Sequence, residues 1–479
     1  MSFLTEAQKS VNDARVLVEV DITDLNSQWV NNGAGVWVYN LDVSYSWVDD
    51  TLLDASWTAS DLANVGSVRS DNLLLTEVSA LASLTPSEFF WDAANSDLYI
   101  CLADYDEPYI HEVRVGFVYG FSHDEFTPSG MDNPQLYQGR LVRAPIVSIA
   151  RDPLFFGRLS YGGGSFDIIN RDGEYDTFAI DNNLYGNEVR VRLGFDDLAY
   201  ADYQRIFTGY IADVDVGEDV MHIAVSDLRK QLSREITYSC TAENPLTAIR
   251  EILTTYFGAS YDTDYFDTTA WRAATNLVDM RGLTVTIDMQ DSEPAIDVIE
   301  GLCVDGLSIF FKTADNKYSC NGIWDETCYH SSTVCQSDVI EKGSMHYGTQ
   351  EVISSVKVGY AKNWLTTGTA YTRYTYDEYE ASVYAAYQTY NQKSFDTFLD
   401  TKTSADNWAT AFYPMFTEVH GSINVTLPLE YYDKDVEECF QIELNRQNTT
   451  MFGTVPCSIK SMAWDLEGVP TINYELRVI

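Results

Sequence analysis

Basic residues are scarce in this chain. Its 479 residues include 30 Lys and Arg against 72 Asp and Glu, which gives a formal net charge of −42. A nucleic-acid backbone is bound by clustered Lys and Arg, so this balance excludes sequence-specific recognition of DNA or RNA. The acidity itself has two explanations, because net charge reports on solubility and not on fold. It either keeps the protein soluble or lines a channel past which DNA slides without sticking.

Long apolar runs are also missing. No stretch approaches the ~20 apolar residues that a membrane helix needs. Residues 1–10 contain Thr5, Glu6, Gln8 and Lys9 where a secretion signal would be apolar. We therefore expect no transmembrane segment and a protein made in a cytoplasm. Hydrophobic residues at 45% and charged residues at 21% are typical of a folded, soluble chain.

Signatures of common enzymes are absent from the sequence. Gly162, Gly163 and Gly164 are followed by Ser-Phe-Asp, without the helix and the Lys that a phosphate-binding loop requires. Neither a Gly-x-Ser-x-Gly elbow nor a His-Glu-x-x-His pair occurs. Carboxylate neighbours such as Asp49 and Asp50 arise without catalytic purpose in so acidic a chain. We predict no catalytic residue, no cofactor-binding residue and no enzyme.

The eight cysteines fit a reducing compartment, because the chain is long and shows no secretion signal. Cys320, Cys328, His330 and Cys335, with Cys303 upstream, could ligate zinc or an iron–sulfur cluster. The two-residue spacing of paired ligands is missing, so chelation would depend on the tertiary fold. We interpret these cysteines as thiols without a metal, and the ligand set stays an alternative.

A run of oxygen-bearing side chains has two interpretations. Four residues alternate as in a calcium loop: Asn170, Asp172, Glu174 and Asp176. Gly173 comes too early for such a loop, and Asp181 stands where the loop needs Glu. Asn-Arg-Asp-Gly is also a favoured turn sequence. We therefore predict a turn that ends at Gly173, and no metal-binding residue.

Short β-branched and aromatic runs dominate the chain, and most alternate with period two. They cover residues 15–20, 35–39, 97–101, 113–119, 188–194, 221–225, 283–287, 356–360 and 422–427. The strongest helical pattern covers Pro245–Phe257, between Asn244 as N-cap and Gly258 as stop. Two more helices are expected over residues 293–302 and 404–419. The sequence thus predicts a mainly β protein with a smaller α+β portion.

Changes in this pattern divide the chain into four parts. We expect an N-terminal β domain over residues 1–130 and a central β domain over 131–235. A mixed α/β domain over 236–350 and a β domain with one helix over 351–479 follow. No low-complexity linker separates these parts, which predicts domains that pack on one another.

Several short sequence motifs, called phrases below, occur in a fixed order along the chain. The first is a strand followed by a turn of sequence Asn-x-Asp-Gly-x-Tyr-Asp. A β-strand that ends in Gly-Phe comes next, and a strand of sequence Phe-x-Gly-x-Ile follows it. These phrases lie at residues 157–159, 165–176, 186–195, 207–211 and 223–228, with further ones at 89–100, 307–311, 315–318 and 457–479. In this order they resemble the tail hub proteins, also called baseplate hub or tail-tip proteins, of long-tailed phages and gene-transfer particles.

This resemblance implies a structural virion protein at the distal end of a phage tail. Residues 131–235 and 351–479 would be β-barrels similar to tail-tube domains, with the mixed domain 236–350 inserted between them. Three copies would then present six barrels, so that a threefold hub continues a sixfold tube. The hub would be assembled in the host cytoplasm, close the tube, anchor fibres and a spike, and permit DNA passage.

The implied partners are further copies of the chain in a homotrimer, the tail tube or distal tail protein, and fibre, spike or lysin proteins. No cofactor is predicted. Some tail-tip relatives hold an iron–sulfur cluster through cysteines of a C-terminal domain, whereas four cysteines of this chain lie between 303 and 335. The resemblance therefore does not transfer that cluster to this chain.

Two other functions stay open. Exposed Trp29, Trp37 or Trp57 would stack on sugar rings in a receptor- or glycan-binding tail protein. A cell-wall glycosidase is the alternative from the enzyme class, since carboxylates and aromatic side chains are both abundant. Formation of a ring separates the hub from both of these functions.

Overall fold

The computed structural model covers the whole chain and describes most of its residues. Outside the described part lie residues 1–13, 25–29, 34–35, 41–64, 71–72, 75, 78–80, 85–87, 93–96, 102–112, 131–135, 146, 152–158, 163, 174, 177–183, 260, 264, 314–316, 323–332, 349–351, 366–370, 372, 379, 433–438, 446–451, 467–469 and 479. Strands far outnumber helices in the rest, so the mainly β class with a smaller α+β portion is confirmed.

The chain folds into two compact units. The first unit contains residues 1–147, 163–228 and 466–469, and the second contains 148–162, 229–465 and 470–479. A multidomain chain is therefore confirmed, while the four-part division stays a prediction. Among the described residues, no helix is long and apolar enough to cross a membrane.

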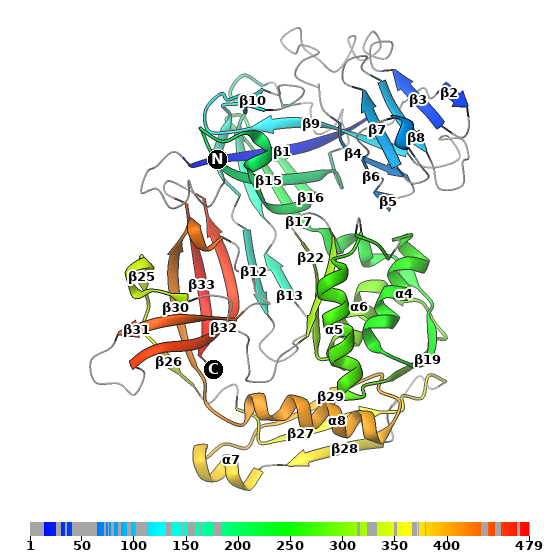
Figure 1. Cartoon of the computed structure of the whole chain (residues 1–479), viewed down its shortest axis with the longest axis vertical. Helices are drawn as coiled ribbons and strands as arrows, with labels where there is room; N and C mark the ends of the chain where they lie inside the picture. Colours follow the sequence, from blue (N-terminus) through cyan, green and yellow to red (C-terminus); the bar gives the residue numbers. More distant parts are fainter. Residues whose placement is uncertain are drawn as a thin grey trace. The chain divides into compact units, whose positions relative to one another are not determined.

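A ten-stranded sheet forms the centre of the first unit (Figure 1). Its order is β11 (Leu141–Arg143), β14 (Ser165–Ile169), β17 (Val220–Asp227), β16 (Gln204–Val216), β15 (Glu188–Phe195), β1 (Ala14–Asp24), β9 (Val113–Phe121), β4 (Val65–Ser70) and β5 (Leu73–Leu74), and β10 (Tyr137–Gln138) pairs with β9. Strand β1 lies between β9 and β15. Segments on either side of residue 130 therefore contribute to one sheet.

The register of β1 against β15 gives this sheet two different faces. Val18 lies opposite Val191, while Glu19 lies opposite Arg190. Because successive side chains of a strand point to opposite faces, the valines share an apolar face and the charged residues share the other. All four side chains are buried, so the charged face is covered as well.

A smaller five-stranded sheet also belongs to the first unit. Its order is β2 (Val30–Gly33), β3 (Val36–Asn40), β8 (Asp97–Cys101), β7 (Glu88–Asp92) and β6 (Thr76–Glu77). Strand β8 pairs antiparallel with both β3 and β7, and the Ile100 side chain is buried.

A nine-stranded sheet forms the centre of the second unit. Its main path is β13 (Leu159–Gly162), β12 (Val147–Arg151), β32 (Phe452–Asp465), β33 (Thr471–Val478), β30 (Gly421–Pro428) and β25 (Glu341–Lys342), joined by β24 (Thr333–Val334), β26 (His346–Tyr347) and β31 (Cys439–Asn445). Buried and more exposed side chains alternate along β30, and Ile423, Val425 and Leu427 are buried. Residues 235–322 are inserted, in sequence, between the first unit's strand β17 and strand β24 of this sheet.

The inserted segment is mixed α/β. It contains α4 (Pro245–Phe257), α5 (Thr268–Arg281), α6 (Ala295–Asp305) and the paired strands β18 (Glu235–Ile236) with β21 (Glu293–Pro294), β19 (Ser239–Glu243) with β20 (Val285–Asp288), and β22 (Ser308–Lys312) with β23 (Tyr318–Gly322). Helix α4 has the predicted bounds, because the Asn244 side chain accepts the Leu246 N–H and Gly258 takes φ +66°. Figure 1 shows the three helices as neighbours.

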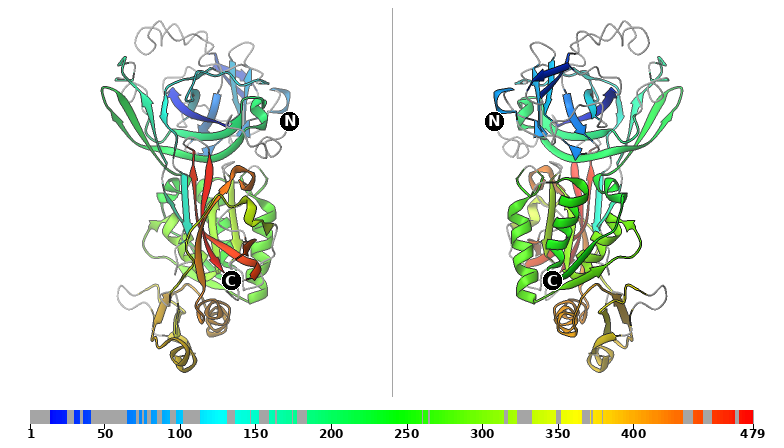
Figure 2. Two further views of the ribbon diagram at one scale, coloured as in Figure 1. Left: turned by 90° about the vertical axis from the view of Figure 1, so that its left-hand side faces the viewer. Right: turned by 90° about the vertical axis from the view of Figure 1, so that its right-hand side faces the viewer.

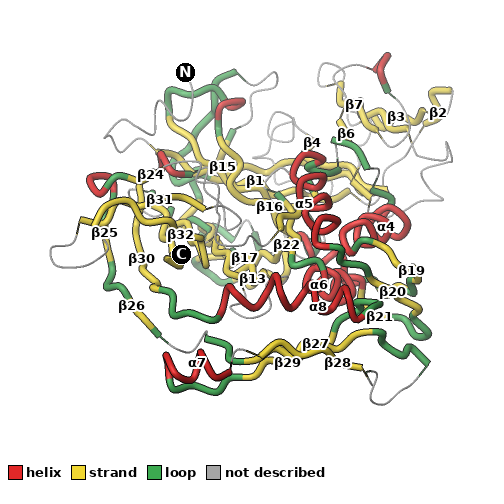
Figure 3. The backbone as a smooth tube through the Cα atoms, turned by 60° about the horizontal axis from the view of Figure 1, so that its bottom comes forward, coloured by secondary structure: helices red, strands yellow, loops and turns green. Residues whose placement is uncertain are grey.

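The last part of the second unit holds β27 (Ser355–Tyr360), β28 (Arg373–Glu378), β29 (Gln392–Asp396), α7 (Glu380–Tyr387) and α8 (Lys402–Phe412). Helix α8 packs on β27 and β28, as Figures 2 and 3 show. The helix predicted over 404–419 begins earlier, at Lys402, and becomes a 3-10 helix at Tyr413–Phe416. Pro414 lacks the N–H that the α-helical pattern needs.

The prediction of one helix within 351–479 was wrong. Helix α7 is a second one, and its apolar side chains are spread around the helix rather than gathered on one face. Only Val383 of its described side chains is buried, whereas Tyr384 is exposed. A segment without an apolar stripe gives no helical periodicity in the sequence.

Candidate functional site

The turn predicted at Asn170 is present in the structure. Gly173 N–H donates to the Asn170 carbonyl at 2.9 Å, and Gly173 adopts φ +74°. The Asn170 amide oxygen accepts the Tyr175 N–H at 2.8 Å, and its nitrogen donates to Asp176 and to the Gly217 carbonyl. The Asn170 side chain therefore holds the turn through both its oxygen and its nitrogen. Glu174 lies outside the described residues.

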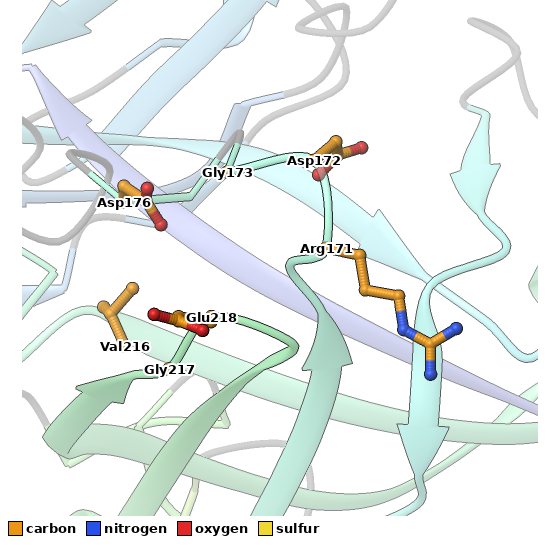
Figure 4. Close-up of a pocket in the computed structure, with 7 residues that line it drawn as sticks. All are labelled: Arg171, Asp172, Gly173, Asp176, Val216, Gly217 and Glu218. Carbon is orange, nitrogen blue, oxygen red and sulfur yellow. The ribbon is translucent and has the colours of Figure 1, made fainter.

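A hollow lies beside this turn (Figure 4). It is lined by Arg171, Asp172, Gly173, Asp176, Val216, Gly217 and Glu218. Asp172 forms an ion pair with Arg140 at 2.8 Å. Figure 4 shows Asp176 and Glu218 on opposite sides of the hollow, with Arg171 directed away from both. The described His, Cys, Asp and Glu residues contain no group of three placed to hold a metal ion, in this hollow or elsewhere.

The cysteine set is only partly within the described residues. Cys303 on α6 and Cys320 on β23 are buried, and Cys335 is exposed. Burial raises the pKa of the Cys303 thiol well above its ordinary value, so this thiol stays protonated. Cys328 and His330 lie outside the described residues. The alternative of a metal site at these positions therefore stays untested.

A buried charge network lies on the covered face of the first unit's sheet, and its residues were not predicted as a site. We call it the Glu19 network. Its centre is the Glu19 carboxylate, which is 1% exposed. Arg190 and Arg192 each donate an Nε–H to it, at 2.9 and 3.1 Å. The hydroxyls of Tyr137 and Tyr200 donate to its Oε1 at 2.7 and 2.5 Å. The network ties β1, β10, β15 and the segment before β16 together.

Two glycines let aromatic side chains cover this face. A Cβ atom on Gly120 would lie 2.6 Å from the Tyr137 ring, and one on Gly194 would overlap the Tyr203 ring. Any other residue at either position would push the ring off the sheet. The glycines on β9 and β15 are therefore the sequence signal that this face is covered by tyrosines.

The pKa values of the network keep its charges fixed at neutral pH. Burial by itself raises the pKa of Glu19, but the charges of Arg192 and Arg190 and the tyrosine hydrogen bonds outweigh it and lower that pKa to about 2. Burial and the nearby carboxylate raise the pKa of both Tyr137 and Tyr200. General acid–base catalysis works best with a pKa near the ambient pH. The arrangement is suited to holding strands together rather than to moving protons.

A second buried carboxyl group lies in the other unit. Asp305, at the end of α6, is 0% exposed; the Phe398 N–H donates to its Oδ2 at 3.0 Å, and its Oδ1 has no hydrogen-bond partner in the described structure. Burial raises its pKa well above 3.8, and the Phe398 hydrogen bond and the Lys362 charge offset this only in part. The ammonium of Lys362 instead faces the Trp364 ring, 3.9 Å from its centroid. Within the described part of the chain, Asp305 is therefore a buried acid without an ion-pair partner.

Comparisons with known proteins rest on structure alone. No family model and no curated protein sequence matches the chain. Similar solved structures include a tail protein from Neisseria meningitidis, with 10% identity, a TM-score of 0.45, and coverage of 73% of this chain and 94% of that one. The 43 kDa tail protein of a prophage from Shewanella oneidensis has 14% identity, a TM-score of 0.42, and coverage of 74% and 98%.

A chain from the virion of a native gene transfer agent particle is also similar, with 11% identity and a TM-score of 0.33. The similarity covers 74% of this chain and 80% of that one. These three similar structures are thus two tail proteins and a chain of a virion.

Proposed function

We propose that this chain is a non-enzymatic structural protein of a virion, the hub at the distal end of a tail tube. The observation that supports it most is where the resembling phrases fall in the fold. Residues 165–169 form β14, 188–195 form β15, 207–211 lie in β16 and 223–227 lie in β17. These four strands are neighbours in one sheet, so the phrases describe a single structural unit.

The glycine of the Phe-x-Gly-x-Ile phrase has a packing role. A Cβ atom on Gly209 would lie 2.6 Å from the Ser226 carbonyl oxygen and 2.7 Å from the Phe207 ring. Strands β16 and β17 could then not pair closely at this point, because backbone atoms cannot yield as a flexible side chain can. Strand packing within the subunit therefore accounts for the glycine of this phrase.

Two large sheets, one in each unit, support the arrangement proposed for the ring. Each subunit would contribute two tube-like domains, and three subunits would present six of them to a sixfold tube. The tail tube or distal tail protein would bind one side of this ring, and fibres, a spike or a lysin the other. The acidic balance of 72 to 30 residues would let DNA pass without adhering.

The glycan-binding alternative has no support in the described residues. Trp29 and Trp57 lie outside them, and of Trp37 only the backbone, in β3, is described. The hub therefore stays the proposal that specific observations favour.

The ring is tested by the mass of the purified full chain. Native mass spectrometry over a range of concentrations and salt should give three copies, and negative-stain images should show a closed threefold ring. Addition of the adjoining tail protein should stabilise this species, because neighbours cover strand edges and apolar rims. A chain that stays monomeric under all these conditions, with the tail protein present, would contradict the proposal.

A further inference from the structure

On the charged face of the first unit's sheet, three arginines lie near each other, and only two of them form ion pairs among the described side chains. Glu19 and Glu188 form ion pairs with Arg190, and Glu19 also pairs with Arg192. A third arginine, Arg205 on β16, lies directly opposite Arg192 in the strand register. Its Nε is buried without a hydrogen-bond partner, and Arg205 has no ion pair within the described part of the chain.

This placement of Arg205 opposes the stability of the subunit itself. Like charges directly opposite on paired strands destabilise a sheet. Burial lowers the pKa of the Arg205 guanidinium, and the charges of Arg192 and Arg190 lower it further. A guanidinium nevertheless stays protonated in proteins, so the repulsion persists in the folded subunit.

Arg205 lies at an end of β16 that a partner can reach. Gln204, Arg205 and Ile206 are half-buried, unlike the fully buried residues that follow. Strand β17 joins β16 only from Gly209 onward. No described strand pairs with these first three residues on the side away from β15.

We propose that Arg205 binds a carboxylate of a second copy of this chain, so that its guanidinium gains an ion-pair partner only in the assembly. With 72 acidic and 30 basic residues, an approaching copy presents mostly carboxylates. A guanidinium matches a carboxylate with two parallel hydrogen bonds. A guanidinium also binds a nucleic-acid phosphate, so duplex DNA is included in the test below.

This inference rests on the proposed ring and predicts two effects of opposite sign for one substitution. In Arg205→Gln, the thermal unfolding midpoint of the monomer, measured below the association midpoint, should rise because the repulsion from Arg192 is gone. The dissociation constant of the assembly should increase at least about tenfold because the carboxylate loses its partner. Arg205→Glu should strengthen both effects, since a carboxylate at this position would attract Arg192 and repel the second copy.

Arg171→Gln is the matched control, because it removes the same charge from the same unit at a side chain that is 78% exposed. Arg171→Gln should change neither the thermal unfolding midpoint of the monomer nor the dissociation constant of the assembly. A lower midpoint with unchanged association would show that Arg205 has only a role within the subunit. Stronger association of Arg205→Gln would identify Arg205 as a charge that protects a strand edge.

The same variants separate this inference from the proposed function. If the wild type forms rings and Arg205→Gln forms them equally well, the inference fails and the hub proposal stands. If the wild type never associates, both fail. Binding of duplex DNA by the wild type that is lost in Arg205→Gln would overturn the inference in favour of a phosphate ligand.

Discussion

Replacing Glu19 by Ala should lower the free energy of unfolding by about 3–5 kcal/mol, because removal of one partner from a buried ion pair leaves an uncompensated charge. Here two guanidiniums lose the Glu19 carboxylate, and Arg190, which is only 3% exposed, keeps Glu188 alone. Two tyrosine hydroxyls lose their acceptor at the same time. Urea-induced unfolding at pH 7, followed by tryptophan fluorescence, measures the change.

Asp196→Ala is the control for this variant. Asp196 forms an ion pair with Arg15 at 2.5 Å on the same sheet, but its side chain is 49% exposed. An exposed pair contributes about 0–1 kcal/mol, so this variant should unfold almost as the wild type does. Equal losses for the two variants would contradict the view that burial gives the Glu19 network its strength.

The Glu19 network also predicts that the stability of the fold decreases in acid. Its carboxyl pKa is about 2 in the folded chain and 4.5 in its ordinary state. A pKa that is lowered by folding gives stability that is present above pH 4.5 and is lost as the pH falls toward 2. Glu19→Gln keeps the shape of the side chain. Its free energy of unfolding should therefore lose this part of the dependence on pH.

Replacing Asp305 by Asn should raise the free energy of unfolding at pH 8 by about 1–3 kcal/mol, because the unfolded chain then no longer gains from ionising this acid. Folding raises the pKa of Asp305, so its contribution is fully present below about pH 4 and is lost as the pH rises toward the folded value. Asn keeps an oxygen that can accept the Phe398 N–H. Unfolding curves at pH 4, 6 and 8 should show an advantage that grows with pH.

The groups that face Asp305 set the size of this effect. Lys362 is the cation that favours its ionised form, and the titratable groups coupled to it include Tyr371 and Cys303. Asp297→Asn on the exposed side of the same helix is the control and should change stability by less than about 1 kcal/mol. An advantage of Asp305→Asn that is the same at pH 4 and pH 8 would exclude ionisation as its cause.

Local signals account for the elements that the sequence predicted well. The helix Pro245–Phe257 has its cap, its proline and its terminal glycine within the segment itself. Helix α5 was missed, because only Trp271, Ala274 and Val278 are buried and other apolar residues, such as Met280, are exposed. Asp267, whose side chain accepts two N–H groups, and Gly282 at φ +64° were the signals that could have revealed it.

The site was less predictable than the fold. The turn at Asn170 could be predicted because its hydrogen bonds join residues close in sequence. Glu19 and Arg190 are 171 positions apart, and only the pairing of β1 with β15 brings them together. A charged residue in a strand looks solvent-facing in the sequence unless the covering tyrosines are known.

The position of the chain in a particle tests the central claim most directly. Virions of the particle that encodes this chain, labelled with antibody against it and imaged by electron microscopy, should carry the label at one end of the tail, at the tip distal to the capsid. Averaged images of that tip should show threefold density that fits three copies. Label along the whole tail, on the capsid, or absent from intact particles would contradict the account.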